Sequence, residues 1–222
     1  MLKYLKYLSY PLDIDAPRPP AIPAANLEEF MSVKNDGASV QKLELYSHTG
    51  THIDTSAHVF ETGVYITDFR PEELVFDKVG IIEIKLPDNY IIEKRDLEKY
   101  DAVLSENEFI IFNFNLYDKR VNTPENYIYN SPGFAIDAGK YIGEFKNIRG
   151  MGMDSPSVAS IFKIDETMKA HNELLALHGG KFVIIEEMKL EKGEKPPDKL
   201  IIVPWLVKGM HSGPCVIIGG YC

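Results

Sequence analysis

The chain has 222 residues, of which 45% are apolar and 26% are charged, and its formal net charge is −9. This composition is typical of a globular protein with its own core, and it excludes a disordered or low-complexity chain. The acidic balance argues against nucleic acid or an anionic membrane as a partner, and no apolar run reaches the length of a membrane span. We therefore predict one domain over residues 1–222, with neither nucleic acid nor a membrane as its partner.

The cysteine content and the N-terminal sequence bear on the compartment. The N-terminal stretch has no apolar core and no cleavage site of a secretory signal. Cys215 and Cys222 are the two cysteines of the chain, which are too few for a disulfide framework. A reducing cytoplasm is the location that these features predict.

The order of predicted elements indicates a mixed α/β fold. Five prolines in the first 23 residues predict an irregular start, with a short helix over 26–31, and a β pattern begins at Gln41. Runs rich in Val, Ile and Phe predict strands over 79–86, 109–114, 182–186, 199–203 and 215–218. Helices are predicted over 93–100, 136–145 and 165–177. Several strands have no helix beside them, so we expect more sheet than in a doubly wound fold.

A dense group of histidines is the strongest chemical signal. Three of the six histidines, His48, His52 and His58, lie in the eleven-residue segment HTGTHIDTSAH, with Asp54 among them. Imidazole and carboxylate groups are ligands of zinc and of other divalent metals. The segment therefore predicts a metal site.

The spacing within this segment decides between a helix and a strand. His48 and His52 have the i, i+4 spacing of helical zinc motifs, but Thr-Gly-Thr between them disfavours a helix and no Glu follows His48. In an extended chain the even-numbered positions share one face, but four residues cover roughly 13 Å, too far for one ion. We predict a strand that bends at Gly50 and brings His48, His52 and Asp54 together. His58 is then either a further ligand or a proton shuttle.

The remaining histidines and a pair of glutamates carry weaker signals. Taken alone, His171 is expected to be solvated or half-buried on a helix, and His178 to be a helix C-terminal residue. His211 is expected to be a loop side chain rather than part of a pocket. Glu186 and Glu187 end an apolar strand, which is where the sites of α/β sheets gather.

The segment HTGTHIDTSAH resembles the H-x-G-T-H-x-D-x-P-x-H signature of the cyclase-like metal-dependent hydrolases, which include bacterial kynurenine formamidase and isatin hydrolase. Every defined position matches except the Pro, which is Ser56 here. Weaker similarities follow in the family's order: RGMGMDSPSV at 149–158, AHNELL followed by VIIEEM, and PWLVKGMHSGPCVII near the end of the chain.

The resemblance implies a swivelling β/β/α fold with a mixed sheet, and a homodimer or a higher homo-oligomer. It implies one or two divalent ions, zinc first and manganese second, with His58 as the catalytic acid and base. The implied metal ligands are His48, His52, Asp54, His171 and Glu186. Glu187 is the competing candidate for the glutamate ligand.

The function that follows is hydrolysis of an amide or formamide C–N bond in a small molecule, as in an arylformamidase, with His58 moving the proton of a metal-activated water. The G-x-S-x-G motif of serine hydrolases is absent, so no serine nucleophile is expected. The alternatives are a lactam or lactone hydrolase, a cyclase on the same scaffold, and a metal-binding module without turnover.

Overall fold

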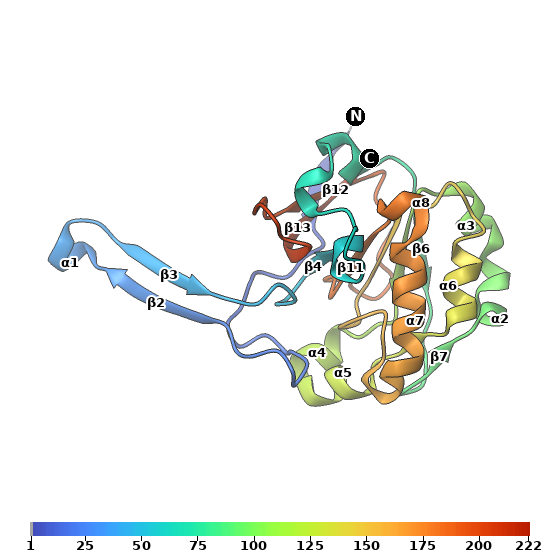
Figure 1. Ribbon diagram of the computed structural model, residues 1–222, viewed down its shortest axis with the longest axis horizontal. Helices are drawn as coiled ribbons and strands as arrows, with labels where there is room; N and C mark the ends of the chain where they lie inside the picture. Colours follow the sequence, from blue (N-terminus) through green and yellow to red (C-terminus); the bar gives the residue numbers. More distant parts are fainter. Residues whose placement is uncertain (1) are drawn as a thin grey trace.

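Nine strands form one mixed sheet in the order β5-β12-β13-β4-β11-β10-β8-β6, with β1 paired to β13. The computed structural model describes residues 2–222, and Figure 1 shows the sheet with helices packed beside it and a two-stranded arm that extends from the body. The strands of this sheet are β1 (Tyr4–Tyr7), β4 (His52–Asp54), β5 (Val75–Phe76), β6 (Val79–Glu83), β8 (Phe109–Asn113), β10 (Gly150–Met153), β11 (Val183–Glu186), β12 (Lys199–Pro204) and β13 (Ser212–Tyr221). The mixed α/β fold that the sequence predicts is confirmed.

The sheet is nearly closed. Its first and last strands in spatial order, β5 and β6, are separated along the chain only by Asp77 and Lys78, so the two edges have to approach each other. The pairs β6–β8, β8–β10 and β10–β11 are parallel, whereas β11 and β4 are antiparallel. The strand direction therefore changes between β11 and β4. In α/β sheets such a point of change is a common position for a ligand site.

Alternate residues of the central strands enter two separate cores. On β8, Ile110 and Phe112 pack toward the helices, whereas Phe109 and Ile111 point into the interior of the curled sheet. All four side chains have no exposed surface. A strand that is buried on both faces has a continuous apolar sequence. This run of apolar residues is why the sequence predicts a strand at β8.

Helices cover the outer face of the parallel part of the sheet (Figure 1). They are α2 (Lys94–Leu97), α3 (Asp101–Glu106), α4 (Tyr117–Asn122), α5 (Pro124–Asn130), α6 (Ile136–Ile142), α7 (Ile164–Leu175) and α8 (Leu177–Gly180). At Gly139 a Cβ atom would lie 3.2 Å from the carbonyl oxygen of Ala170, so glycine allows α6 and α7 to approach closely. Within residues 2–222 no helix is long and apolar enough to cross a bilayer.

Two predictions for the start of the chain are wrong. The predicted helix over Asn26–Met31 is a strand, β2, which pairs antiparallel with β3 (Val40–Glu44) across the short helix α1 (Val33–Asp36). Strand pairing overrides the helix propensity of Leu, Glu and Met there. The expected irregular start also contains β1, which pairs with β13. The remaining short sheet joins β7 (Ile91–Ile92) and β9 (Gly133–Phe134).

Candidate metal centre

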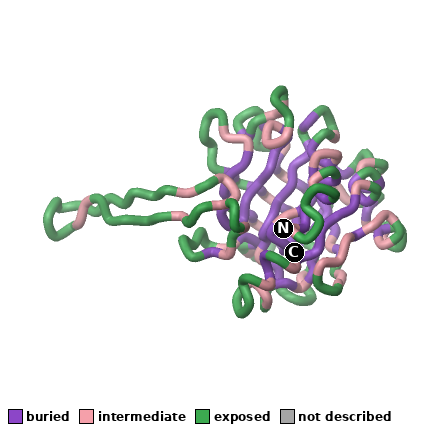
Figure 2. Tube along the Cα trace, turned by 60° about the horizontal axis from the view of Figure 1, so that its bottom comes forward, coloured by how far each residue is buried: buried purple, intermediate pink, exposed green. Residues whose placement is uncertain are grey.

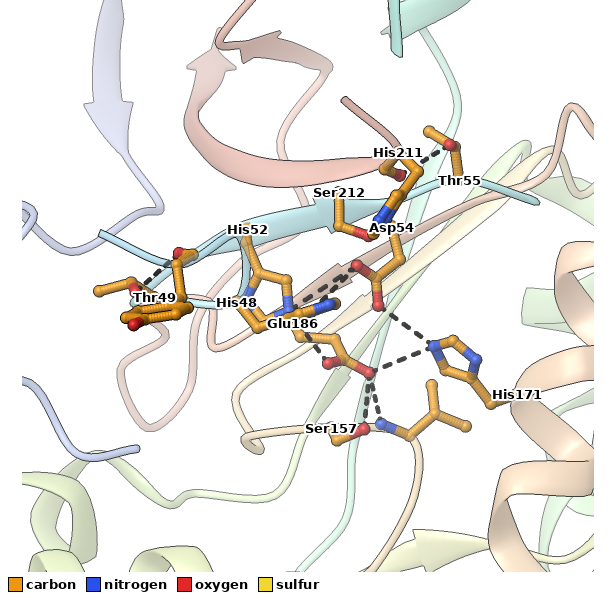
Figure 3. Close-up of polar contacts among 12 residues, drawn as sticks. His48, Thr49, His52, Asp54, Thr55, Ser157, His171, Glu186, His211 and Ser212 are labelled. Carbon is orange, nitrogen blue, oxygen red and sulfur yellow. Dashed lines mark hydrogen bonds and ion pairs between the residues drawn. The ribbon is translucent and has the colours of Figure 1, made fainter. Parts of the chain in front are cut away.

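The histidine-rich segment folds as a turn followed by a short strand. Gly50 has φ +65°, so the chain bends there as predicted. His52 and Asp54 project from the same face of β4, while Ile53 between them enters the interior core. The bend brings His48 back to this face, where its Nδ1 lies 3.3 Å from Asp54 Oδ1 (Figure 3).

Two side chains from far downstream reach the same place. Glu186 ends β11 and lies directly opposite His52 in the antiparallel register, with its Oε2 atom 3.2 Å from His52 Nε2. His171 projects from α7, and its Nε2 lies 3.2 Å from Asp54 Oδ2. The exposed fraction of His171 is 1%, so the expectation of a solvated or half-buried side chain, made from this residue alone, is wrong. The reason is that α7 brings this ring against the buried carboxylate of Asp54 on β4.

The two neighbouring glutamates have different partners. The side chain of Glu186 points into the cluster (Figure 3), whereas Glu187 accepts hydrogen bonds from Nε and Nη2 of Arg120 at 2.8 and 2.5 Å. The backbone of Glu187 has φ +59°, which ends the strand and turns this residue out of its register. Geometry therefore favours Glu186 as the ligand candidate.

Glu186 is held in place by a loop that follows β10. Its Oε1 accepts hydrogen bonds from Ser157 Oγ at 2.9 Å and from the backbone N–H of Val158 at 2.8 Å. Ser157 belongs to the segment RGMGMDSPSV that resembles the family. This segment therefore orients the carboxylate and leaves Oε2 directed at His52.

Removal of this hydroxyl group should weaken metal binding without removing a ligand. We expect Ser157→Ala to lower metal affinity by about 10- to 100-fold, the usual cost of losing an outer-shell partner. Titration with a fluorescent metal-competing chelator measures the change. The exposed Ser105→Ala variant is the matched control, and equal affinity in both variants would contradict the orienting role of Ser157.

The cluster has buried polar atoms that the protein itself does not satisfy. Within the described chain, His52 Nε2, Asp54 Oδ1 and His171 Nδ1 are buried without a hydrogen-bond partner. His52 Nδ1 donates to the carbonyl oxygen of Gly50 at 2.8 Å, which orients the ring so that Nε2 faces the cluster. A buried polar atom without a partner lowers the stability of the fold. A cation bound between His52 and Asp54 would satisfy two of these atoms, His52 Nε2 and Asp54 Oδ1.

The donor set fits one or two cations. Two groups have ligand atoms within 4.8 Å of one another: His48, Asp54 and His58, and His52, Asp54 and Glu186. Asp54 belongs to both groups and has two oxygens, so it would contribute a donor to either one. Three or more nitrogen and carboxylate donors at this spacing suit zinc and other first-row divalent ions.

Charges within the cluster follow from burial and from the neighbouring groups. Burial lowers the pKa of His48 to about 4, which leaves this ring neutral near pH 7. Burial opposes ionisation of Asp54, but the hydrogen bond from His171 and the nearby histidines hold its pKa below the usual range. Burial would also lower the pKa of His52, yet the nearby Glu186 carboxylate, with its Oε2 atom 3.2 Å from Nε2, and the charge of Asp54 raise it to about 9. A cation must therefore displace a proton from His52 at neutral pH.

His58 lies at the edge of the cluster, on a single turn of 3-10 helix, Ser56–His58, rather than on a continued strand. Its ring centroid is 4.6 Å from that of His48 and 5.6 Å from that of His171. Burial lowers its pKa from the usual value of 6.5. Ser56, which stands where the family signature has Pro, accepts a hydrogen bond from the backbone N–H of Val64 at 2.8 Å and so anchors this turn.

The sequence prediction missed His211 as a neighbour of the site. It lies on the loop before β13, as expected, but its ring stacks on that of His58 at a centroid distance of 5.3 Å. Its Nδ1 is 3.0 Å from Ser212 Oγ. Its position inside PWLVKGMHSGPCVII, one of the segments that resemble the family, is the sequence feature that could have placed it near the site. His178 lies outside the cluster and donates from Nε2 to the carbonyl oxygen of Ile148 at 2.6 Å.

A cavity of about 250 Å³ opens beside these side chains. The cluster forms one wall, and Glu187 and Ser157 lie at its margin. The facing wall is mainly aliphatic: Pro19, Ala21, Ile22, Pro156 and Met168. A small molecule in this cavity would touch the candidate ligands and His58 at the same time.

Comparison with known families agrees with this geometry. Residues 7–160 of the chain match the putative cyclase family. The chain belongs to this family. The match spans both the histidine-rich segment and the loop that holds Glu186.

Relatives and solved structures extend the similarity to nearly the whole chain. Kynurenine formamidase from Bacillus thuringiensis (strain Al Hakam) is 27% identical over 208 residues, which cover 93% of this chain and 92% of the relative. Isatin hydrolase A from Labrenzia aggregata, solved with benzyl benzoate bound, superposes with a TM-score of 0.84 at 18% identity, covering 98% of this chain and 93% of that chain. A predicted metal-dependent hydrolase from Bacillus stearothermophilus superposes with a TM-score of 0.75 at 19% identity, covering 98% of each chain. The two superpositions show that this fold is shared.

Proposed function

We propose that the protein is a metal-dependent hydrolase that cleaves the C–N bond of an amide or formamide in a small molecule. The observation that carries the proposal is the convergence of unsatisfied buried nitrogen and oxygen atoms beside a cavity that also contains His58. The similarity to a kynurenine formamidase and the fold shared with an isatin hydrolase support the reaction class.

The proposed ligands are the five side chains that form the cluster: His48, His52, Asp54, His171 and Glu186. A divalent ion, zinc or manganese, would supply a Lewis acid that lowers the pKa of water to about 7 and polarises the scissile carbonyl. Ser157 and the carbonyl oxygen of Gly50 orient Glu186 and His52 toward that ion.

His58 is the proposed acid and base. Its lowered pKa keeps the ring neutral near pH 7, so it can accept a proton from water in the cavity. It then returns that proton to the leaving nitrogen, which could not depart as an anion. The stacked ring of His211 restricts the orientation of His58, whose side chain lines the cavity.

The cavity limits the substrate. Its volume of about 250 Å³ suits a small molecule, because pockets for drug-sized ligands are larger, about 300–1,000 Å³. Among the described residues that line it, the only rings other than proline are imidazoles. The lining therefore offers no Phe, Tyr or Trp ring on which an aryl substrate could stack. An aliphatic amide, a lactam or a lactone would fit this cavity as well as an aryl formamide.

An activity panel with metal-loaded protein tests the proposal. Formamides, simple amides, lactams, lactones and esters would be offered to the protein loaded with zinc or with manganese. Hydrolysis of an amide or formamide supports it, and preferential turnover of lactams or lactones favours the alternative hydrolase. Full metal occupancy without turnover on any member of the panel would contradict an enzymatic function and favour a binding module.

Metal removal should destabilise the fold. A ligand that binds only the folded state at 100 times its Kd adds about 2.7 kcal/mol, which for a domain of this size corresponds to roughly 5–10 °C in Tm. We expect chelation to lower Tm by this amount and metal addition to restore it, as measured by scanning calorimetry. An unchanged Tm would show that the cluster holds no ion in solution.

The proposed compartment is the cytoplasm. Both cysteines are free, with Cys215 buried and Cys222 exposed. Free thiols persist in a reducing compartment.

A further inference from the structure

Among the described residues of the cavity wall, Glu187 is the one carboxylate that the proposed ligand set does not use. Its exposed fraction is 4%. Its backbone has φ +59°, a left-handed conformation that is uncommon for residues other than glycine. A strained backbone position that the surrounding structure maintains is a feature of many functional sites. The carboxylate at this position is therefore a candidate for a role beyond the fold.

The backbone of Glu187 is held from two sides. Its N–H donates to the carbonyl oxygen of Ser155 at 2.9 Å, and its own carbonyl oxygen accepts a hydrogen bond from Thr51 Oγ1 at 2.6 Å. Strand β11, which leads to Glu187, is buried along its whole length, and Figure 2 shows the same for much of the sheet in the body. A side chain on such a framework can hold a ligand in a defined position.

Arg120 fixes the side chain of Glu187 and occupies only one of its two oxygens. Both hydrogen bonds from Arg120 end on Oε1. The guanidinium is itself held by the ring of Tyr10, whose centroid lies 3.6 Å from Arg120 Cζ. Within the described chain Oε2 accepts no hydrogen bond. Arg120 is thus a positioning residue that leaves Oε2 for a ligand.

The charges of the cavity wall favour a cationic ligand at this oxygen. Three carboxylates line the cavity, those of Asp54, Glu186 and Glu187, and none of the described lining residues is Lys or Arg. A bound metal would use Asp54 and Glu186, which leaves the carboxylate of Glu187 for the substrate. The net charge of −9 also attracts a cationic molecule toward the protein.

We propose that Glu187 is a specificity-determining residue whose Oε2 accepts a hydrogen bond from a protonated primary amine of the substrate. The preferred substrate is then a small amide or formamide that carries an ammonium group apart from the scissile bond. The inference rests on the proposed function for the nature of that bond, but recognition of the amine does not require turnover. A hydrogen bond to a charged group corresponds to about 10- to 100-fold in affinity.

Paired ligands test the proposal on the metal-loaded full chain. One member of each pair is an N-(aminoalkyl)formamide, and the other is the N-alkylformamide in which a methyl group replaces the amine, over a series of chain lengths. At pH 7 the alkyl amine is protonated. For the best pair we expect the wild type to favour the amine by about 10- to 100-fold in kcat/KM and, by calorimetry, in affinity.

Substitutions at Glu187 should abolish this preference. In Glu187→Gln the ratio of the two kcat/KM values, and of the two affinities, should fall to near one. Glu187→Asn is the second variant, because Asn tolerates the left-handed backbone. Glu194→Gln is the matched control, since Glu194 is 6% exposed in its side chain and pairs with Lys6 at 2.7 Å outside the cavity. Each ratio is measured within one variant, so a loss of metal or of active protein cancels.

The outcomes separate this proposal from the proposed function. Equal affinity, or no measurable affinity, for both members of every pair would overturn it, as would a preference that both Glu187 variants retain. Turnover of both members without preference would leave the hydrolase function standing and overturn the role of Glu187. Preferential binding of the amine without turnover of either member would support that role and count against the hydrolase function.

Discussion

His58→Ala should retain metal and lose about 10²- to 10⁴-fold in kcat, the typical contribution of general acid–base catalysis. The ligand candidates on β4, β11 and α7 remain in this variant, so at least one cation can still bind. What disappears is the ring that exchanges a proton between water and the leaving nitrogen. Steady-state kinetics and elemental analysis of the same preparation measure both effects.

The pH profile adds a second readout for His58. Burial lowers its pKa in the folded protein, so its neutral, proton-accepting form persists below pH 6.5 and is lost only as the pH falls through the lowered pKa. We expect the acid limb of kcat/KM in the wild type to lie below pH 6.5 and to flatten in His58→Ala. His178→Asn is the matched control, because Asn tolerates the left-handed backbone at this position, φ +53°. Near-wild-type turnover in His58→Ala would exclude the shuttle role, and loss of metal would make His58 a ligand.

Asp54→Asn should lose metal and activity together. The substitution keeps the shape of a side chain that is 1% exposed, but it removes the negative charge that lies among His48, His52 and His171. Asp54 also belongs to both candidate ligand groups, so the loss of affinity should exceed the roughly 10- to 100-fold expected for an outer-shell change. Calorimetric metal titration measures it, with the exposed Asp165→Asn as the control. An Asp54→Asn variant with wild-type metal content would remove Asp54 from the ligand set.

The sequence predicted the central part of the site because that part is local. His48, His52 and Asp54 lie within seven residues, and the need for a bend at Gly50 follows from the length of an extended chain. Glu186 and His171 could not be placed in this way, because their proximity depends on strand register and helix packing over more than a hundred residues. Resemblance to a family, rather than local pattern, pointed to them.

The elements that the sequence misjudged depend on distant partners. The segment Asn26–Met31 has residues with good helix propensity, and only its pairing with β3 makes it a strand. The short strand β1 acquires its conformation from β13 at the other end of the chain. His211 was read as a loop side chain, and only the packing of its ring on His58 connects it to the site. Strands such as β8 were predicted well because burial on both faces leaves a continuous apolar run.

The most direct test of the metal centre is a crystal structure of the metal-loaded protein with diffraction data collected on both sides of the metal absorption edge. We expect an anomalous peak about 2.0–2.2 Å from donor atoms of His52, Asp54 and Glu186, with His48 and His171 completing the coordination of one or two ions. A structure without a peak in this cluster, or with its peak at another group of side chains, would show that these residues do not form the metal centre.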